Sequence, residues 1–174
     1  LSDAQIKLSS APMVVDLSAL WAGPLCSHIL QQCGFRVVKV ESVQRPDGAR
    51  KGSPIHFNAL HKGKRLRRFD FADANDLQGL RELLASADVV IEGSRPRALR
   101  ALGLDRDSLM DGACSATSSQ LWLSLTAYGR PRPYGDWVGF GDDVAIAAGA
   151  HALTNNKLPS FLGDAIADPL TGLL

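Results

Sequence analysis

The chain has 174 residues and a formal net charge of +1, with 45% hydrophobic and 21% charged residues. This length suffices for one domain with a hydrophobic core, and this composition excludes a disordered, collagen-like or coiled-coil chain. The small net charge gives no general attraction to nucleic acid or to a membrane surface, and no apolar run approaches the roughly 20 residues of a membrane span.

The first elements along the chain predict a β-α-β unit. Residues 12–17 are mostly apolar, as in a buried parallel strand. Residues 22–24, Ala-Gly-Pro, break the chain, and residues 25–33 then show helical spacing up to Gly34. Residues 35–41 predict the second strand, and we expect a right-handed crossover between the two strands.

The remainder continues this alternation after a polar loop at residues 42–54. Strands are predicted at residues 66–71, 87–92 and 121–125, and helices from Asp73 through Leu84, at 96–103 and at 143–149, with a Gly- and Pro-rich loop at 128–139. Alternating strands and helices favour an α/β fold with a Rossmann-like, mostly parallel sheet and flanking helices. We treat residues 1–174 as a single domain.

The cysteines and the two ends of the chain indicate where the protein is located and whether the chain is part of a longer protein. Cys26, Cys33 and Cys114 are odd in number without metal-ligand spacing, and the first residues form no signal peptide. We therefore expect a cytoplasmic protein without a metal site. The chain starts with Leu and ends at 168–174 in what resembles the first turn of a helix. We expect it to be part of a longer protein and poorly stable alone.

Ligands of parallel sheets bind beyond the carboxyl ends of the strands, here residues 18–24, 41–50, 92–97 and 126–129. A dinucleotide there would need three glycines in the first turn, where this chain has only Gly23. Pro24 also removes a backbone donor. We therefore expect no NAD, and Glu41, the acid that would hold its ribose, is equally explained as a solvated strand end.

Charged residues near these loops allow two interpretations each. Lys64 and Arg95 suit an anionic ligand and are equally explained as solvated charges. Asp164 and Asp168 resemble caps of a helix N-terminus, yet a carboxylate also serves as a covalent nucleophile toward a thioester. The histidines show no ligand spacing, so we expect neither a metal site nor a serine-hydrolase triad.

Several short motifs follow one another in a fixed order. Residues 14–24 read V-V-D-L-S-A-L-W-A-G-P, residues 34–41 read G-F-R-V-V-K-V-E, and residues 57–65 read F-N-A-L-H-K-G-K-R. Residues 87–104 contain A-D-V-V-I-E, R-P and L-G-L, and residues 124–129 read S-L-T-A-Y-G. Together they resemble the family III CoA-transferases, a superfamily with formyl-CoA and carnitine-CoA transferases and α-methylacyl-CoA racemases.

This resemblance implies a Rossmann-like CoA-binding domain within a longer chain, two copies of which interlock as a homodimer. It implies transfer of coenzyme A from an acyl-CoA to a carboxylic acid through an aspartyl anhydride and an aspartyl-CoA thioester, with no permanently bound cofactor. Asp168 matches the nucleophile, and Asp164 is the fallback. Residues implied to bind CoA are Trp21, Ala22, Gly23, Pro24, Lys64, Glu92, Arg95, Thr126 and Tyr128.

The chain departs from its relatives at several positions. Trp21 stands where formyl-CoA transferases have glutamine, and Thr126 lies near a cation of the family's CoA site. Residues 139–143 lack the histidine of the racemases, which argues against racemase chemistry. The alternatives to CoA transfer are an acyl-CoA racemase and a non-catalytic half of a fused chain that binds CoA or dimerises.

Overall fold

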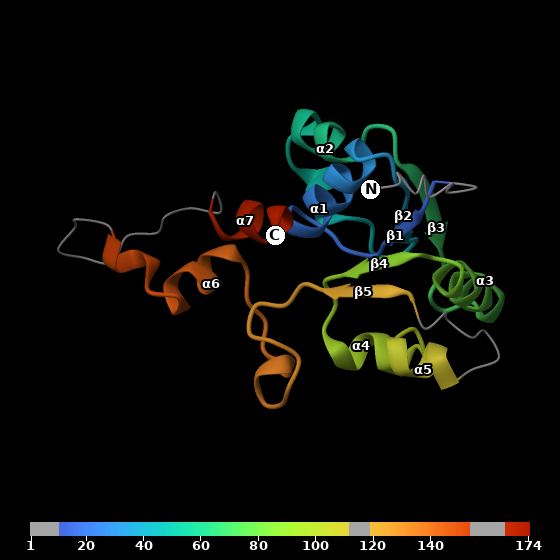
Figure 1. The fold of residues 1–174 in the computed structure, drawn as a ribbon. Coiled ribbons are helices and arrows are strands. Elements are labelled where there is room, and N and C mark those ends of the chain that lie inside the picture. Colours follow the sequence, from blue (N-terminus) through green and yellow to red (C-terminus); the bar gives the residue numbers. More distant parts are fainter. Residues whose placement is uncertain (1–10, 112–118, 154–165) are drawn as a thin grey trace, which may run out of the picture.

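The computed structural model describes residues 11–111, 119–153 and 166–174, and the strands of this part form one parallel sheet (Figure 1). The sheet has the order β3-β2-β1-β4-β5, and every neighbouring pair is parallel. Its strands are β1 (Met13–Asp16), β2 (Arg36–Ser42), β3 (Arg65–Phe69), β4 (Val89–Glu92) and β5 (Leu121–Ser124). The prediction of a Rossmann-like parallel sheet is confirmed.

The strand order reverses between β1 and β4. From β1 the chain proceeds outward through β2 to β3, and then returns to the other side of β1 to form β4 and β5. Such a reversal leaves a crevice at the carboxyl ends of the two central strands, because the connections leave them in opposite directions.

Helices cover both faces of this sheet (Figure 1). Helix α1 (Ala22–Gln32), with α2 (Pro54–His61) and α7 (Ala167–Leu173), lies on one face. The other face carries α3 (Ala74–Ala85), α4 (Pro96–Ala101) and α5 (Arg106–Asp111), whereas α6 (Gly141–Ala147) lies beyond the sheet. Short 3₁₀ turns are η1 (Gly48–Lys51), η2 (Tyr134–Asp136) and η3 (Ala150–Leu153).

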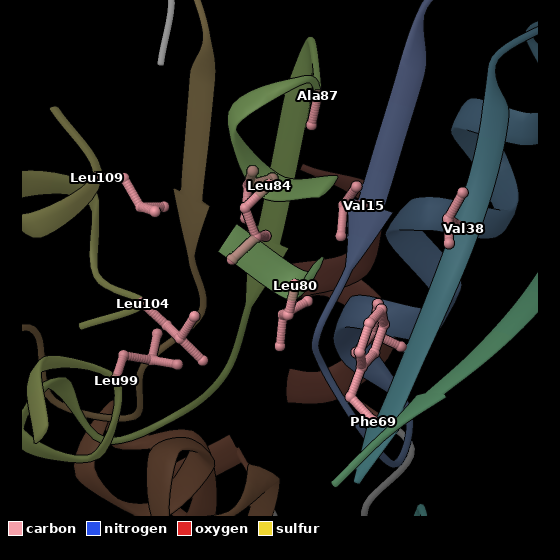
Figure 2. Packing of buried hydrophobic residues seen from close by; sticks show 11 residues of the cluster. Val15, Val38, Phe69, Leu80, Leu84, Ala87, Leu99, Leu104 and Leu109 are labelled. Carbon is pink, nitrogen blue, oxygen red and sulfur yellow. The ribbon is translucent and has the colours of Figure 1, made fainter. Parts of the chain in front are cut away.

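Each face of the sheet has its own apolar core, because side chains alternate along a strand. Val14 packs with the α1 side, whereas Val15 packs on the α3 side. Figure 2 shows Leu80 and Leu84 of α3 on the latter side, together with Leu109 of α5. The short apolar runs that predict the strands are therefore runs buried on both faces.

One local prediction was wrong, and two helices were missed. Helix α1 begins at Ala22, so residues 22–24 do not break the chain: proline is tolerated in a first turn, whose N–H groups have no intrahelical acceptor. Helix α2 begins with Pro54 inside the predicted loop at 42–54, and the Ser53 hydroxyl accepts from His56 N–H at 3.4 Å. Helix α5 was not predicted.

Two further observations concern the described residues. The predicted cap at Asp73 is confirmed, since its carboxylate accepts from the N–H groups of Asn75 and Asp76 at 2.9 Å. None of the helices in residues 11–111, 119–153 and 166–174 has the length and apolar character needed to cross a membrane.

Candidate active site

A cleft of about 180 Å³ lies at the carboxyl end of the central strands. Its lining comes from the turn between β1 and α1, from the segments after β4 and β5, and from the starts of α6 and α7. It contains five of the predicted site residues: Trp21, Ala22, Gly23, Thr126 and Asp168. Segments distant in sequence thus meet where the strand order reverses.

Two hollows continue this cleft on either side. A hollow of about 250 Å³ shares Thr126 and Ala127 with it, and holds the predicted residues Arg95 and Tyr128. A hollow of about 300 Å³ shares Ser18 and Ala19 with it. The latter adds apolar side chains, among them Phe71, Leu99 and Leu102, and two cations, Lys39 and Arg45. The three spaces share lining residues, and we refer to them together as the trough.

Asp168 is half-buried in the first turn of α7, which packs against α1. Two glycines permit this position. A Cβ at Gly172 would lie 2.6 Å from the carbonyl oxygen of Ala22, and a Cβ at Gly141 would lie 2.9 Å from Asp168 Oδ1. Any larger residue at either position would displace the carboxylate or its helix, so glycine is required by close approach rather than by a turn.

The first turn of the site, residues 18–24, is similarly tight. A Cβ at Gly23 would lie 2.0 Å from Ser18 Oγ, so no other residue fits there without moving the turn. Leu20 has φ of 69°, a left-handed conformation that is uncommon for a non-glycine residue. Its N–H donates to Asp47 Oδ1 at 3.1 Å. The turn therefore depends on contacts from outside itself.

Four buried charges lie beneath this turn, and we call Asp16, Lys39, Asp47 and Lys64 the buried charge cluster. Lys64 Nζ lies 3.5 Å from Asp16 Oδ2, and Lys39 Nζ lies 3.5 Å from Asp47 Oδ2. These side chains are at most 2% exposed. Two positive and two negative charges make the cluster neutral overall, as a low-dielectric interior requires.

The environment shifts two pKa values in this cluster. Burial acts to raise the pKa of Asp16, but the charges of Lys39 and Lys64 and hydrogen bonds from nearby serines outweigh it and hold the pKa below its ordinary value. Burial lowers the pKa of Lys64 to about 8, against the attraction of Asp16. At neutral pH both groups are charged and form an ion pair.

Three of the residues predicted to bind CoA make contacts behind the cleft. Lys64 Nζ donates to the Pro24 carbonyl at 2.7 Å and to Ser27 Oγ at 2.6 Å, so it faces the interior. Pro24 is buried inside α1. Glu92 is buried, and its carboxylate accepts from Arg130 Nη1 at 2.8 Å.

Other candidate residues lie outside the described part of the chain or were not predicted. Asp164 falls outside the described residues. Asp16, Lys39 and Asp47 were not predicted as site residues, although a charged residue inside an apolar strand, as in β1 and β2, signals a buried partner. Within the described part of the chain, no group of three or more His, Cys, Asp and Glu side chains is arranged to hold a metal ion.

Comparison with known proteins adds independent information. Residues 12–174 match the family described as CoA-transferase family III. The chain is 32% identical to an acyl-CoA transferase of Fusarium pseudograminearum, over 92% of this chain and 38% of that one. It is 29% identical to a succinate–glutarate CoA-transferase of Agrobacterium fabrum, over 92% and 43%.

Solved structures agree with this similarity. A CaiB/BaiF family protein from Brucella suis has a TM-score of 0.83 and 32% identity, covering 94% of this chain and 46% of its own. The chain thus spans less than half the length of the relatives that it matches.

Proposed function

The chain belongs to CoA-transferase family III, and we propose that the whole protein transfers coenzyme A from an acyl-CoA to a carboxylic acid, with Asp168 as covalent nucleophile. The observation that carries this proposal is the position of Asp168. Among the described residues, it is the carboxylate that lines the cleft formed by the motif segments at residues 18–24 and 124–129. On family grounds we further propose a cytoplasmic homodimer in which residues 1–174 form one CoA-binding domain.

The proposed chemistry proceeds through covalent intermediates on Asp168. Its carboxylate oxygen attacks the thioester carbon, the carbon–sulfur bond breaks, and CoA leaves as thiolate, which gives a mixed anhydride of the acyl group and Asp168. The thiolate then attacks the aspartyl carbon, releasing the first acid and leaving an aspartyl-CoA thioester. The acceptor carboxylate attacks this thioester to form a second anhydride, from which the thiolate takes the acceptor acyl group and frees Asp168.

The start of α1 supports this role for the cleft. Each attack places negative charge on a carbonyl oxygen, which needs preorganised donors. Ala22 and Gly23 line the cleft and are the first residues of α1. The first N–H groups of a helix have no intrahelical acceptor and carry partial positive charge, so they are suited to stabilise that oxygen.

The trough beside the cleft suits the rest of CoA. We place the nucleotide end in the hollow lined by Arg45, Phe71 and Leu99, because it combines a cation with an apolar wall. The pantetheine arm would then pass Ser18 and Ala19 to reach Asp168. Exposed Arg95 is the N-cap residue of α4, next to Ser94 of the same hollow, and is available to the CoA phosphates.

The test is to trap the covalent intermediate in the protein at its native length. We expect hydroxylamine, added with a reactive acyl-CoA, to leave a hydroxamate on Asp168 that tandem mass spectrometry assigns. Asp168→Asn should give no hydroxamate and no transfer, with CoA affinity within about threefold of wild type, a change below 1 kcal/mol. Asp107→Asn, on α5 away from the cleft, is the matched control.

Two results would overturn the assignment. A hydroxamate on Asp164 would move the nucleophile to that residue. Measurable CoA binding without any adduct, across acyl-CoAs of different length and charge, would favour a racemase or a non-catalytic CoA-binding module.

A further inference from the structure

We infer that the buried charge cluster is a positioning device, which fixes the turn at residues 18–24 in the form that the Asp168 cleft requires. This inference rests on the proposed function of that cleft. It assigns the lysines of the cluster to backbone carbonyls of the protein, and not to the phosphates of CoA.

The beginning of the turn is held by two members of the cluster. Ser18 N–H donates to Asp16 Oδ1 at 2.9 Å, and the Ser18 hydroxyl donates to the same oxygen. Lys39 Nζ donates to the Ser18 carbonyl. Both backbone groups of Ser18 are therefore engaged by charged side chains from β1 and β2, which fixes the direction in which the chain leaves β1.

The middle and the end of the turn are held by the other two members. Asp47 Oδ1 accepts from Leu20 N–H, at the residue with the left-handed backbone, and also from Ala49 N–H at 2.9 Å. Lys64 Nζ donates to the Pro24 carbonyl in the first turn of α1. An uncommon backbone conformation persists only where its surroundings determine it, and the cluster supplies those surroundings.

The pairing within the cluster links these contacts to one another. Lys64 pairs with Asp16, and Lys39 pairs with Asp47. Each lysine that donates to a carbonyl of the turn is therefore neutralised by a carboxylate that accepts from an N–H group of the turn. Charge-assisted hydrogen bonds are stronger and more directional than neutral ones. Removal of one member leaves its partner charged and buried, and therefore loosens two contacts to the turn at once.

The burial of Lys64 favours a positioning role over binding of a phosphate. Its side chain is 1% exposed, and its amino group contacts Asp16, Pro24 and Ser27. A phosphate could reach it only if these contacts broke. Lys62, two residues earlier, is exposed and provides a matched lysine outside the cluster.

The first test measures amide hydrogen exchange of Lys64→Met in the protein at its native length, with Lys62→Met as control. We expect the peptide covering residues 18–25 to exchange at least about tenfold faster in Lys64→Met, as loss of charge-assisted contacts predicts, while residues 89–92 of β4 stay protected. Lys62→Met should match wild type. Unchanged exchange of residues 18–25 in Lys64→Met would overturn the inference, whatever the nucleophile is.

The second test separates positioning from phosphate binding in the same variants. A positioning role predicts that Lys64→Met lowers kcat about tenfold or more, because a small misplacement near the reacting atoms is costly. The ratio of affinities for CoA and 3′-dephospho-CoA should stay at the wild-type value. Loss of that discrimination would make Lys64 a phosphate ligand. If Lys64→Met does not fold, pairing it with Asp16→Asn restores a neutral cluster, and the exchange of residues 18–25 should still rise.

Discussion

The turn at residues 18–24 and helix α7 both line the cleft, but different forces hold them. The buried charge cluster holds the turn through directed hydrogen bonds to the backbone of residues 18–24. Helix α7 lies against α1 (Figure 1), where Gly172 lets the two backbones approach.

This difference has a physical reason. The turn must present particular backbone groups to the cleft, and only directed hydrogen bonds fix the orientation of a peptide group. Helix α7 already has a regular backbone, so its distance from α1 is what positions Asp168. Close packing fixes the distance between α7 and α1 and involves no charged group. The two supports should therefore fail under different substitutions and at different pH.

The largest expected effect comes from breaking the charge balance beneath the turn. Asp16→Asn keeps the size of the side chain but leaves Lys64 and Lys39 with one carboxylate too few. We expect the free energy of unfolding to fall by about 3–5 kcal/mol, because an unpaired charge remains buried. Denaturant unfolding followed by tryptophan fluorescence at neutral pH measures this loss.

Asp88→Asn is the matched control for this substitution. Asp88 is exposed, and its carboxylate accepts one hydrogen bond from Met13 N–H at 2.7 Å. We expect its loss to be about 1 kcal/mol, the value of a single ordinary hydrogen bond. Equal losses in the two variants would mean that the buried charge cluster contributes no more than a surface carboxylate, and the comparison of the two supports would fail.

We expect the next largest effect from disturbing the packing of α7 against α1. Gly172→Ala adds a methyl group 2.6 Å from the Ala22 carbonyl oxygen and 3.0 Å from Leu25 Cβ. We expect a stability loss of about 1–3 kcal/mol from overpacking, together with a fall in kcat because Asp168 moves with its helix. Thermal unfolding and steady-state kinetics at native length measure the two consequences.

Gly79→Ala makes the same change in a helix with room for it. A Cβ at Gly79 of α3 would meet only the Phe69 ring, at 3.8 Å. Alanine is favoured over glycine inside a helix, so this variant should gain roughly 0.5–1 kcal/mol. A loss of stability in Gly79→Ala equal to that in Gly172→Ala would show that close approach to α1 is not what distinguishes position 172.

The two supports also differ in how far the sequence predicts them. The apolar runs around Val14, Val37 and Val89 are short and bounded by turns, so these strands and a mostly parallel sheet could be predicted from the pattern. Asp168 and Gly172 both lie in the short helix α7, so the proposed nucleophile and the glycine that approaches α1 belong to one element. Resemblance to known relatives was needed to propose Asp168 as a nucleophile, because the sequence alone favours a helix cap.

The buried charge cluster could not be predicted from the sequence in the same way. From the sequence, a lysine such as Lys64 in a polar segment is expected to be solvated or to bind a ligand, because its ion pair with Asp16 of β1 forms only in the tertiary fold. Helix α2 was missed for a related reason. Its short sequence, from Pro54 to His61, buries only Leu60, so its apolar spacing is too weak to signal a helix.

The last difference between the two supports is a dependence on pH that should belong to the turn support alone. His61 lies beside the buried charge cluster, and its ring stacks on Phe57 with centroids 4.2 Å apart. Neither ring nitrogen has a hydrogen-bond partner among the described residues. Burial, with the positive charges of Lys64 and Lys39, lowers the pKa of His61 to about 4, although Asp16 and Asp47 oppose this shift.

The sign of the effect follows from this lowered pKa. The unfolded chain takes up the proton near pH 6.5, before the folded protein does, so the contribution of His61 is complete above pH 6.5 and is lost as the pH falls toward 4. The slope contributed by one such group is at most about 1.4 kcal/mol per pH unit. Chemical unfolding at several pH values should show this slope in wild type and a flatter one in His61→Phe, which cannot titrate.

Asn58→Ala, on the same helix and without a titratable group, should keep the wild-type slope. Gly172→Ala should also keep it, because that substitution lowers stability through packing and leaves the charges beneath the turn unchanged. A slope that disappears in Gly172→Ala would mean that protonation acts through α7 as well, and the two supports would then be one coupled unit. A slope that persists in His61→Phe would show that His61 is not the source of the acid sensitivity.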